Sequence, residues 1–253
     1  MSRRVVITGL GTVNPLGNNV HDFWEGVKEN RLGISKVEQF DTDAIGVSVA
    51  GQVKDFEPTD FIDKKEAKRM ERFTQFAVVA SDEAIKDSGT DFKDIDPYRA
   101  GVIIGCGIGG IGLTLSEYEK FLNKGPNRVS PFYVPMMIGN MAAGQVSMKT
   151  GFKGDNFSTV TACASGTHAI GESFRKIKDG YLDVCLCGGT ESTILQFTLA
   201  GFNNMKALSK TRQELQFLLT RKETDLYWAK AAECWCLRNM NTLRQEALKS
   251  MQR

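Results

Sequence analysis

Short apolar runs alternate with amphipathic stretches along the first 209 residues of the chain. Three runs are typical of buried strands, at Val5–Gly9, Ala100–Gly105 and Asp183–Gly188. The longest helical pattern covers Lys64–Ser88, where apolar side chains recur at the spacing of one buried face, and Gly89 ends it. Continuous apolar strands interleaved with helices predict an α/β layered fold whose sheet is covered on both faces.

The chain changes character near residue 209. All 25 glycines and all 6 prolines lie at or before Gly201. Residues 1–209 have a net charge of −2, whereas residues 210–253 have a net charge of +4. The apolar residues of this tail follow no sustained helical period. A glycine-free helical appendage is one interpretation; the other, developed below, is a segment that was never selected to pack and is therefore poorly packed.

Composition excludes several classes of function. With 42% hydrophobic and 25% charged residues, the 253-residue chain has the make-up of an ordinary globular protein. No apolar run approaches the roughly 20 residues that a membrane span needs, and the start reads as a buried strand, not a signal peptide. A net charge of +2 is too small to indicate a nucleic acid or an anionic membrane as partner.

The six cysteines do not have the spacing of a metal site. Cys185 and Cys187 form a C-x-C pair, as do Cys234 and Cys236, whereas zinc ligands are typically separated by two to four residues. In the apolar run that contains them, Cys185 and Cys187 are expected to act as small buried hydrophobes. No metal is predicted. Buried thiols in a chain without a secretion signal are typical of the reducing cytosol, which predicts a cytoplasmic protein.

The glycine-rich run Gly105–Gly112 contains a formal G-x-G-x-x-G motif after a strand. Such a motif would suggest a dinucleotide whose pyrophosphate lies on a helix N-terminus. The full fingerprint also needs a second strand that ends in an acidic residue about 20 positions later, whereas Leu113–Leu122 here has a helical pattern. Close approach of the backbone to another segment is the favoured explanation of the glycines.

Cys163 carries the strongest chemical signal. It lies among small and hydroxyl residues, at the point where a strand is expected to give way to a helix. Unpaired N–H groups and the helix dipole favour a thiolate there, and a thiolate accepts an acyl group without further activation. A packing role is the alternative, but small neighbours leave room for a substrate. His168 follows five residues later, about 140° around a helix, and is therefore expected to point away and to be structural.

Several segments together resemble one family, the elongating β-ketoacyl-acyl-carrier-protein synthases (synthase II type) of the thiolase-like superfamily. The resemblance implies the N-terminal half of a thiolase-like layered αβαβα fold, with a synthase domain at residues 1–209 and a non-homologous tail at 210–253. The matching runs, in the family's order, are Arg4–Gly11, Phe40–Thr42, Gly105–Gly110, Ser130–Pro135, Thr161–Gly166, Cys187–Glu191 and Lys206–Ser209.

The resemblance implies a decarboxylative Claisen condensation. Cys163 would receive the acyl chain from acyl-carrier protein as a thioester, and malonyl-carrier protein would lose CO₂ and attack that thioester. The backbone N–H of Cys163 would form half of an oxyanion hole. Ile108 matches the position that lines the acyl pocket, and Phe132 and Tyr133 match a segment near the interface of a homodimer. No cofactor is implied, because the substrates are carried on the phosphopantetheine of acyl-carrier protein.

A cluster of cations at Lys64–Arg69 opens the predicted long helix. Positive charge at a helix start is unfavourable for the helix dipole, so helix stability does not explain it. A solvated charged face is the commoner explanation. The family docks its acidic carrier protein on this helix, which makes Lys65, Lys68 and Arg69 candidate docking residues, together with Lys206.

After Ser209 the chain departs from the family. Two histidines, a lysine and a glycine-rich loop with a phenylalanine, which the family mechanism needs, are missing. Yet DNA that encodes Leu218–Ala231 can, read one base earlier, encode Pro-Phe-Asp-Lys-Lys-Arg-Asp-Gly-Phe-Val-Leu-Gly-Glu-Gly. With the same offset, Cys234–Met240 gives Met-Leu-Val-Leu-Glu-Glu-Tyr, and Glu246–Arg253 gives Arg-Gly-Ala-Lys-Ile-Tyr-Ala-Glu. These are family-like segments in family order, so the reading frame is expected to shift near residue 210.

Three other functions remain open. A polyketide-type ketosynthase shares the same motifs. A non-catalytic dimerising or carrier-binding fragment agrees with the missing histidines. A degradative thiolase that acts on coenzyme A esters is disfavoured by the basic cluster.

Overall fold

The computed structural model describes residues 3–208 and 231–239, and in the last of these segments the side chains of residues 236–238. Two sheets are present in this part of the chain, one of five strands and one of two. The strands are β1 (Val5–Val13), β2 (Ile34–Lys36), β3 (Val49–Gly51), β4 (Ala100–Gly105), β5 (Asn156–Phe157), β6 (Val184–Glu191) and β7 (Ala231–Asn239). The α-helices are α1 (Val20–Lys28), α2 (Lys64–Ala67), α3 (Arg72–Asp87), α4 (Ile111–Lys124), α5 (Tyr133–Met137), α6 (Met141–Thr150), α7 (Ser165–Lys178) and α8 (Gln196–Asn204).

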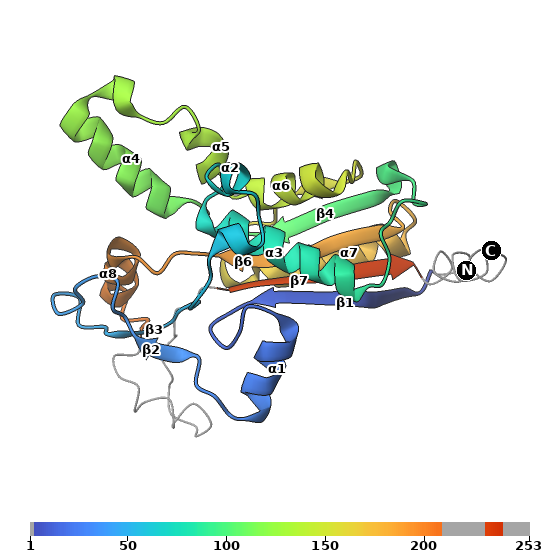
Figure 1. Ribbon diagram of the computed structural model, residues 1–253, viewed down its shortest axis with the longest axis horizontal. Helices are drawn as coiled ribbons and strands as arrows, with labels where there is room; N and C mark the ends of the chain where they lie inside the picture. Colours follow the sequence, from blue (N-terminus) through green and yellow to red (C-terminus); the bar gives the residue numbers. More distant parts are fainter. Residues whose placement is uncertain (1–2, 209–230, 240–253) are drawn as a thin grey trace.

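The larger sheet has the strand order β1-β7-β6-β4-β5. Strands β4, β5 and β6 are parallel, and β7 runs antiparallel to both of its neighbours. Helices α3 and α7 lie on opposite faces of the sheet, while α4 projects away from it (Figure 1). The larger apolar core lies on the α3 face and a smaller one on the α7 face. The prediction of an α/β layered fold with helices on both faces is confirmed.

Strand β1 is longer than the sequence predicts, because it continues from Val5 to Val13 through two glycines. A methyl group added at Gly9 would lie 2.0 Å from the carbonyl oxygen of Ala84, and one added at Gly11 would lie 1.9 Å from that of Ala80. These glycines let α3 pack directly on the strand backbone. They mark close packing of the helix on the strand, and the strand continues beyond its predicted end at Gly9.

The single helix predicted at Lys64–Ser88 is wrong. The chain forms the short α2, a turn, and then α3. Each helix has its own acidic N-cap: Asp63 accepts a hydrogen bond from Lys65 N, and the Glu71 side chain accepts one from Phe73 N at 3.1 Å. A side-chain cap in the middle of an amphipathic run competes with the continuing helix. Of the predicted docking cations, Lys65 therefore lies on α2, whereas Lys68 and Arg69 lie in the turn after it.

The expectation that residues 210–253 are poorly packed is wrong for Ala231–Asn239. This segment forms β7, which lies between β1 and β6 and pairs with both. Cys236 packs with the core on the α3 face and Leu237 with the core on the α7 face. A continuous apolar run at residues 234–237, which suits a strand covered on both faces, and two strand edges that need hydrogen-bond partners explain the insertion. The remaining predicted tail lies outside the described residues.

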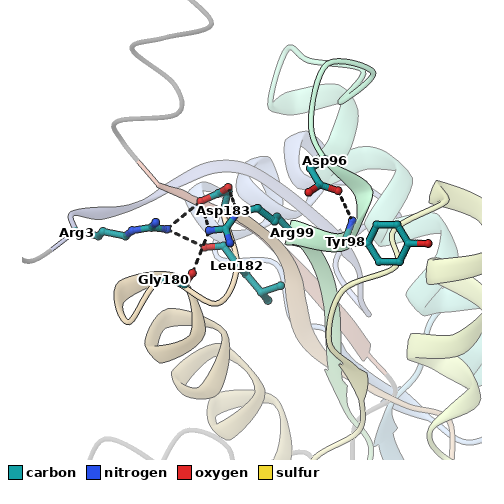
Figure 2. Close-up of polar contacts among 7 residues, drawn as sticks. All are labelled: Arg3, Asp96, Tyr98, Arg99, Gly180, Leu182 and Asp183. Carbon is teal, nitrogen blue, oxygen red and sulfur yellow. Dashed lines mark hydrogen bonds and ion pairs between the residues drawn. The ribbon is translucent and has the colours of Figure 1, made fainter.

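An ion-pair cluster joins the starts of three strands. Asp183 precedes β6, Arg99 precedes β4 and Arg3 precedes β1. Figure 2 shows both guanidinium groups meeting the Asp183 carboxylate: Arg3 Nη1 and Arg99 Nη2 each lie 2.9 Å from Asp183 Oδ1. Hydrogen bonding to Arg99, with the charge of Arg3, holds the pKa of Asp183 below its ordinary value. The cluster aligns the three strands at one edge of the sheet.

In the part of the chain that the structure describes, none of the helices has the length and apolar character to cross a membrane.

Candidate active site

Cys163 lies in a tight turn directly before α7. The turn is a short 3₁₀ helix, Ala162–Ala164, and the Cys163 side chain is exposed. The sequence predicts that a strand leads straight into this helix. Instead, β5 ends at Phe157 and residues 158–161 connect it to the turn. Ala162 has a φ angle of +52°, a left-handed conformation that costs a residue with a Cβ about 1 kcal/mol or more.

Side-chain hydrogen bonds hold this strained turn. The buried Ser165 hydroxyl donates to the Ala162 carbonyl oxygen at 2.7 Å and accepts from Thr161 N at 2.9 Å. The Thr159 hydroxyl in turn donates to the Ser165 carbonyl oxygen at 2.7 Å. His168 Nδ1 lies 2.7 Å from the Thr161 hydroxyl oxygen. His168 therefore supports the residues beside the cysteine, which agrees with the structural role predicted for it.

The glycine-rich run packs against the cysteine turn. A methyl group added at Gly105 would lie 2.3 Å from the Ser165 carbonyl carbon and oxygen. One added at Gly107 would lie 3.6 Å from the Ala162 carbonyl oxygen. Gly105 and Gly107 therefore let the cysteine turn and the start of α7 lie close to the backbone of this run. The prediction that these glycines serve the close approach of another segment is confirmed.

Glu191 is a residue of this site that the sequence predictions missed. Its Oε2 atom accepts hydrogen bonds from Gly107 N at 3.2 Å and from Ile108 N at 2.9 Å. Burial raises the pKa of Glu191 above its ordinary value, although these N–H groups oppose the shift. Burial and the charge of Glu191 raise the pKa of the neighbouring Cys106 to about 12, so this thiol stays protonated. The available signal was the charged residue that ends an otherwise apolar strand.

The predicted acyl-pocket residues come from neighbouring segments. Ile108 is 43% exposed and Phe132 is 44% exposed. Phe132 precedes α5, whose residue Tyr133 places its hydroxyl 3.4 Å from the Thr114 hydroxyl of α4. The other end of α5 lies against the glycine-rich run, because Gly110 N donates to the Met137 carbonyl oxygen at 2.9 Å. Helix α5 therefore connects the Phe132 segment to the glycine-rich run that contains Ile108.

All four predicted docking cations are exposed: Lys65, Lys68, Arg69 and Lys206. Arg69 also lies over the Phe132 ring, with its guanidinium carbon 5.2 Å from the ring centroid. This contact joins the basic turn after α2 to the segment that was assigned to the acyl pocket. Lys206 follows α8 in a left-handed conformation.

An exposed cysteine on a braced turn at a helix start can act as a nucleophile. Within residues 3–208 and 231–239, no cluster of three or more His, Cys, Asp or Glu side chains is arranged to hold a metal ion. Covalent capture of an acyl group is the chemistry that this arrangement supports best.

Comparison of the sequence with known proteins gives a consistent picture. A family model described as the beta-ketoacyl synthase N-terminal domain matches residues 2–219. The curated 3-oxoacyl-[acyl-carrier-protein] synthase 2 of Synechocystis sp. is 47% identical over 207 residues, which are 82% of this chain and 50% of that protein. The protein of the same name from Staphylococcus aureus strain N315 is 49% identical over 208 residues, with the same coverage. The chain spans about half the length of the curated relatives it matches.

Solved structures share the fold. A beta-ketoacyl synthase from Burkholderia phymatum has a TM-score of 0.85 and 26% identity, and the match covers 98% of this chain and 61% of that one. The ishigamide ketosynthase/chain length factor has the same TM-score and coverage at 24% identity. The fold is therefore that of the ketosynthases of the thiolase-like class. The chain belongs to the beta-ketoacyl synthase family.

Proposed function

We propose that this chain is the acyl-accepting half of a 3-oxoacyl-acyl-carrier-protein synthase of fatty acid elongation. The observation that carries the proposal is the exposed Cys163 on its braced turn, in a chain 47% identical to a curated synthase of that name. The Cys163 sulfur attacks the carbonyl carbon of an acyl-phosphopantetheine thioester. A new sulfur–carbon bond forms, the old one breaks, and the carrier thiol leaves with the proton of Cys163.

The residues around Cys163 support separate parts of this reaction. By the family resemblance, the N–H of Cys163, in the turn before α7, stabilises the oxyanion of the tetrahedral intermediate, a contribution of typically about 3 kcal/mol per donor. The acyl chain is proposed to lie in a pocket lined by Ile108, Phe132 and Tyr133. No metal or cofactor takes part in acyl transfer to the cysteine. The family resemblance implies that the condensation itself, with decarboxylation of malonyl-carrier protein, needs two histidines and a lysine from a C-terminal half.

Acyl-carrier protein is the proposed partner, and Lys65, Lys68, Arg69 and Lys206 are its proposed docking residues. Their exposure supports this role, as does a structural neighbour of TM-score 0.79, titled as a type II polyketide acyl-carrier protein in complex with its ketosynthase. Reversing the charge of Lys65 is expected to weaken carrier binding. Lys86→Glu is the matched control, because Lys86 is an exposed lysine near the far end of α3.

A homodimer and a cytoplasmic location are part of the proposal. The family resemblance supports the first, through the segment that contains Phe132 and Tyr133. Five described cysteines without a disulfide bond support the second.

The domain boundary is likewise proposed: a synthase domain at residues 1–209 and an out-of-frame tail at 210–253. Codon chemistry supports this, because Met, Leu and Val codons have thymine at their second position. A shift of one base moves that thymine to the first position of the codon. Codons that begin with thymine include those for Cys, Trp and Leu. DNA that encodes an apolar strand in the original frame would therefore also encode an apolar segment in the shifted frame, and β7 is such a segment.

One observation favours a second function, a carrier-binding fragment without turnover. The four proposed docking cations are exposed, and binding of a carrier protein through them does not need Cys163. This alternative predicts carrier binding without a covalent step.

Intact-protein mass spectrometry distinguishes the two functions. The chain is incubated with palmitoyl-acyl-carrier protein, and the proposal predicts a mass increase of one palmitoyl group that Cys163→Ala abolishes. Peptide mapping is expected to find Cys106 unmodified, because its thiol is buried and protonated. Carrier binding without a mass increase would support the binding fragment. If the chain neither gains mass nor binds the carrier protein, both functions are wrong.

A further inference from the structure

Glu191 ends β6 at the edge of the sheet where the cysteine turn lies. Because β4 and β6 are parallel and Gly105 pairs with Gly189, the residues after both strands emerge side by side. The Glu191 carboxylate is thereby placed against the glycine-rich run that follows β4. It is half-buried, whereas charged side chains are mostly exposed unless they are paired.

Both oxygens of the Glu191 carboxylate accept hydrogen bonds from backbone N–H groups. Oε2 accepts from Gly107 N at 3.2 Å and from Ile108 N at 2.9 Å, and Oε1 accepts from Ser192 N at 3.2 Å. Hydrogen bonds to an ionised acceptor are about twice as strong as neutral ones. One side chain thus fixes two successive amides of a run whose glycines otherwise give the backbone wide freedom.

The fixed segment lies between Glu191 and the nucleophile turn. A methyl group at Gly107 would lie 3.3 Å from Glu191 Oε2 and 3.6 Å from the Ala162 carbonyl oxygen, which precedes Cys163. Ile108 follows Gly107 directly, and its own N–H is bonded to the Glu191 carboxylate. This hydrogen bond fixes the Ile108 backbone and thereby the direction in which its side chain leaves the backbone. No basic side chain donates to this carboxylate among the contacts described for residues 3–208 and 231–239.

We propose that Glu191 is a positioning residue that, by fixing Gly107 and Ile108, determines the length of the acyl chain that Cys163 accepts. This inference rests on the proposed function, since it concerns the acyl group that reaches the cysteine. Glu191 does not touch the acyl group; it acts through Ile108. A loosened Ile108 segment discriminates less between short and long chains, even where Cys163 itself keeps its reactivity.

The test compares Glu191→Gln and Glu191→Ala with the parent chain. Acylation rates of Cys163 are measured with butyryl- and palmitoyl-acyl-carrier protein, and the ratio of the two rates is the readout. Glu83→Gln is the matched control, because the half-buried Glu83 on α3 also accepts two backbone N–H groups, from Thr12 at 2.9 Å and Val20 at 2.8 Å. It braces β1 and α1, not the glycine-rich run.

We expect the chain-length ratio to change about tenfold in Glu191→Ala, which corresponds to about 1.4 kcal/mol of discrimination. Glu191→Gln keeps an acceptor oxygen and is expected to change it less. Glu83→Gln is expected to lower the melting temperature while the ratio stays at the parental value. A ratio unchanged in both Glu191 variants would overturn the proposal, even if their melting temperatures fell.

A second arm separates this proposal from the proposed function. Cys163 is alkylated with N-ethylmaleimide and with a long-chain N-alkylmaleimide, which need no acyl transfer. If the parent chain is not acylated, the proposed function fails, and the ratio of the two alkylation rates then decides the role of Glu191. A ratio that changes in Glu191→Ala and not in Glu83→Gln supports positioning, and equal ratios refute it.

Discussion

Replacement of Ser165 by alanine tests whether side-chain hydrogen bonds hold the strained cysteine turn. The Ser165 hydroxyl is buried and bonds both Ala162 O, at 2.7 Å, and Thr161 N, at 2.9 Å. Each bond stabilises the fold by about 1 kcal/mol net, so their loss is expected to cost about 2 kcal/mol. Because Ala162 has a φ angle of +52°, the turn is then free to relax away from its left-handed conformation.

Relaxation of the turn moves the Cys163 sulfur and N–H together. Displacement of a reacting group by about 1 Å can cost up to about 100-fold in rate, so acylation by palmitoyl-acyl-carrier protein is expected to fall at least tenfold. Alkylation by iodoacetamide needs no oxyanion hole and is expected to change far less. The free energy of unfolding is measured in urea and both reactions are followed by intact-protein mass spectrometry.

Ser173→Ala is the matched control. Ser173 lies on α7, is fully buried, donates to the Ala169 carbonyl oxygen at 2.8 Å and lies 3.2 Å from Cys185 Sγ. Its loss is expected to cost a similar free energy of unfolding, about 1–2 kcal/mol, without slower acylation. If Ser165→Ala unfolds at the parental urea concentration and is acylated at the parental rate, Ser165 does not hold the turn.

Two further predictions concern the sheet. Asp183→Asn is expected to cost about 2 kcal/mol, because Arg3 and Arg99 lose their shared carboxylate. Folding lowers the pKa of Asp183, so the ionised carboxylate stabilises the folded chain above about pH 4, and this stabilisation is lost as the pH falls through the lowered pKa. Urea unfolding at several pH values should therefore show a weaker acid dependence of the free energy of unfolding in Asp183→Asn. A chain that ends after residue 230 lacks β7 and is expected to lose cooperative thermal unfolding, measured by circular dichroism, whereas a chain that ends after Asn239 should keep it. Equal melting of the two chains would show that β7 does not complete the sheet.

Much of the fold follows from periodicity in the sequence. The runs at Ala100–Gly105 and Asp183–Gly188 coincide with the buried strands β4 and β6, because a continuous apolar segment satisfies both faces of a covered sheet. Boundaries were less predictable. Gly9 and Gly11 resemble loop residues in the sequence, yet they stay in β1 because helix α3 needs their missing side chains in order to approach.

The candidate site divides in the same way. Small and hydroxyl neighbours made Cys163 recognisable, since they are local in the sequence. Glu191 was missed because its partners, Gly107 and Ile108, are remote in sequence and meet it only through parallel strand pairing. The division of the cationic run into α2 and a turn was missed because Glu71 acts as a cap only once α3 has formed.

The sequence by itself determined the layered class of fold and the family resemblance, and it singled out Cys163 as the candidate nucleophile, because each rests on local patterns of residue type. Tertiary structure alone decided the strained conformation of Ala162, the brace from Glu191 and the place of Ala231–Asn239 between β1 and β6. These features arise where backbone groups of distant segments must satisfy one another's hydrogen bonds, and that requirement has no signature along the chain.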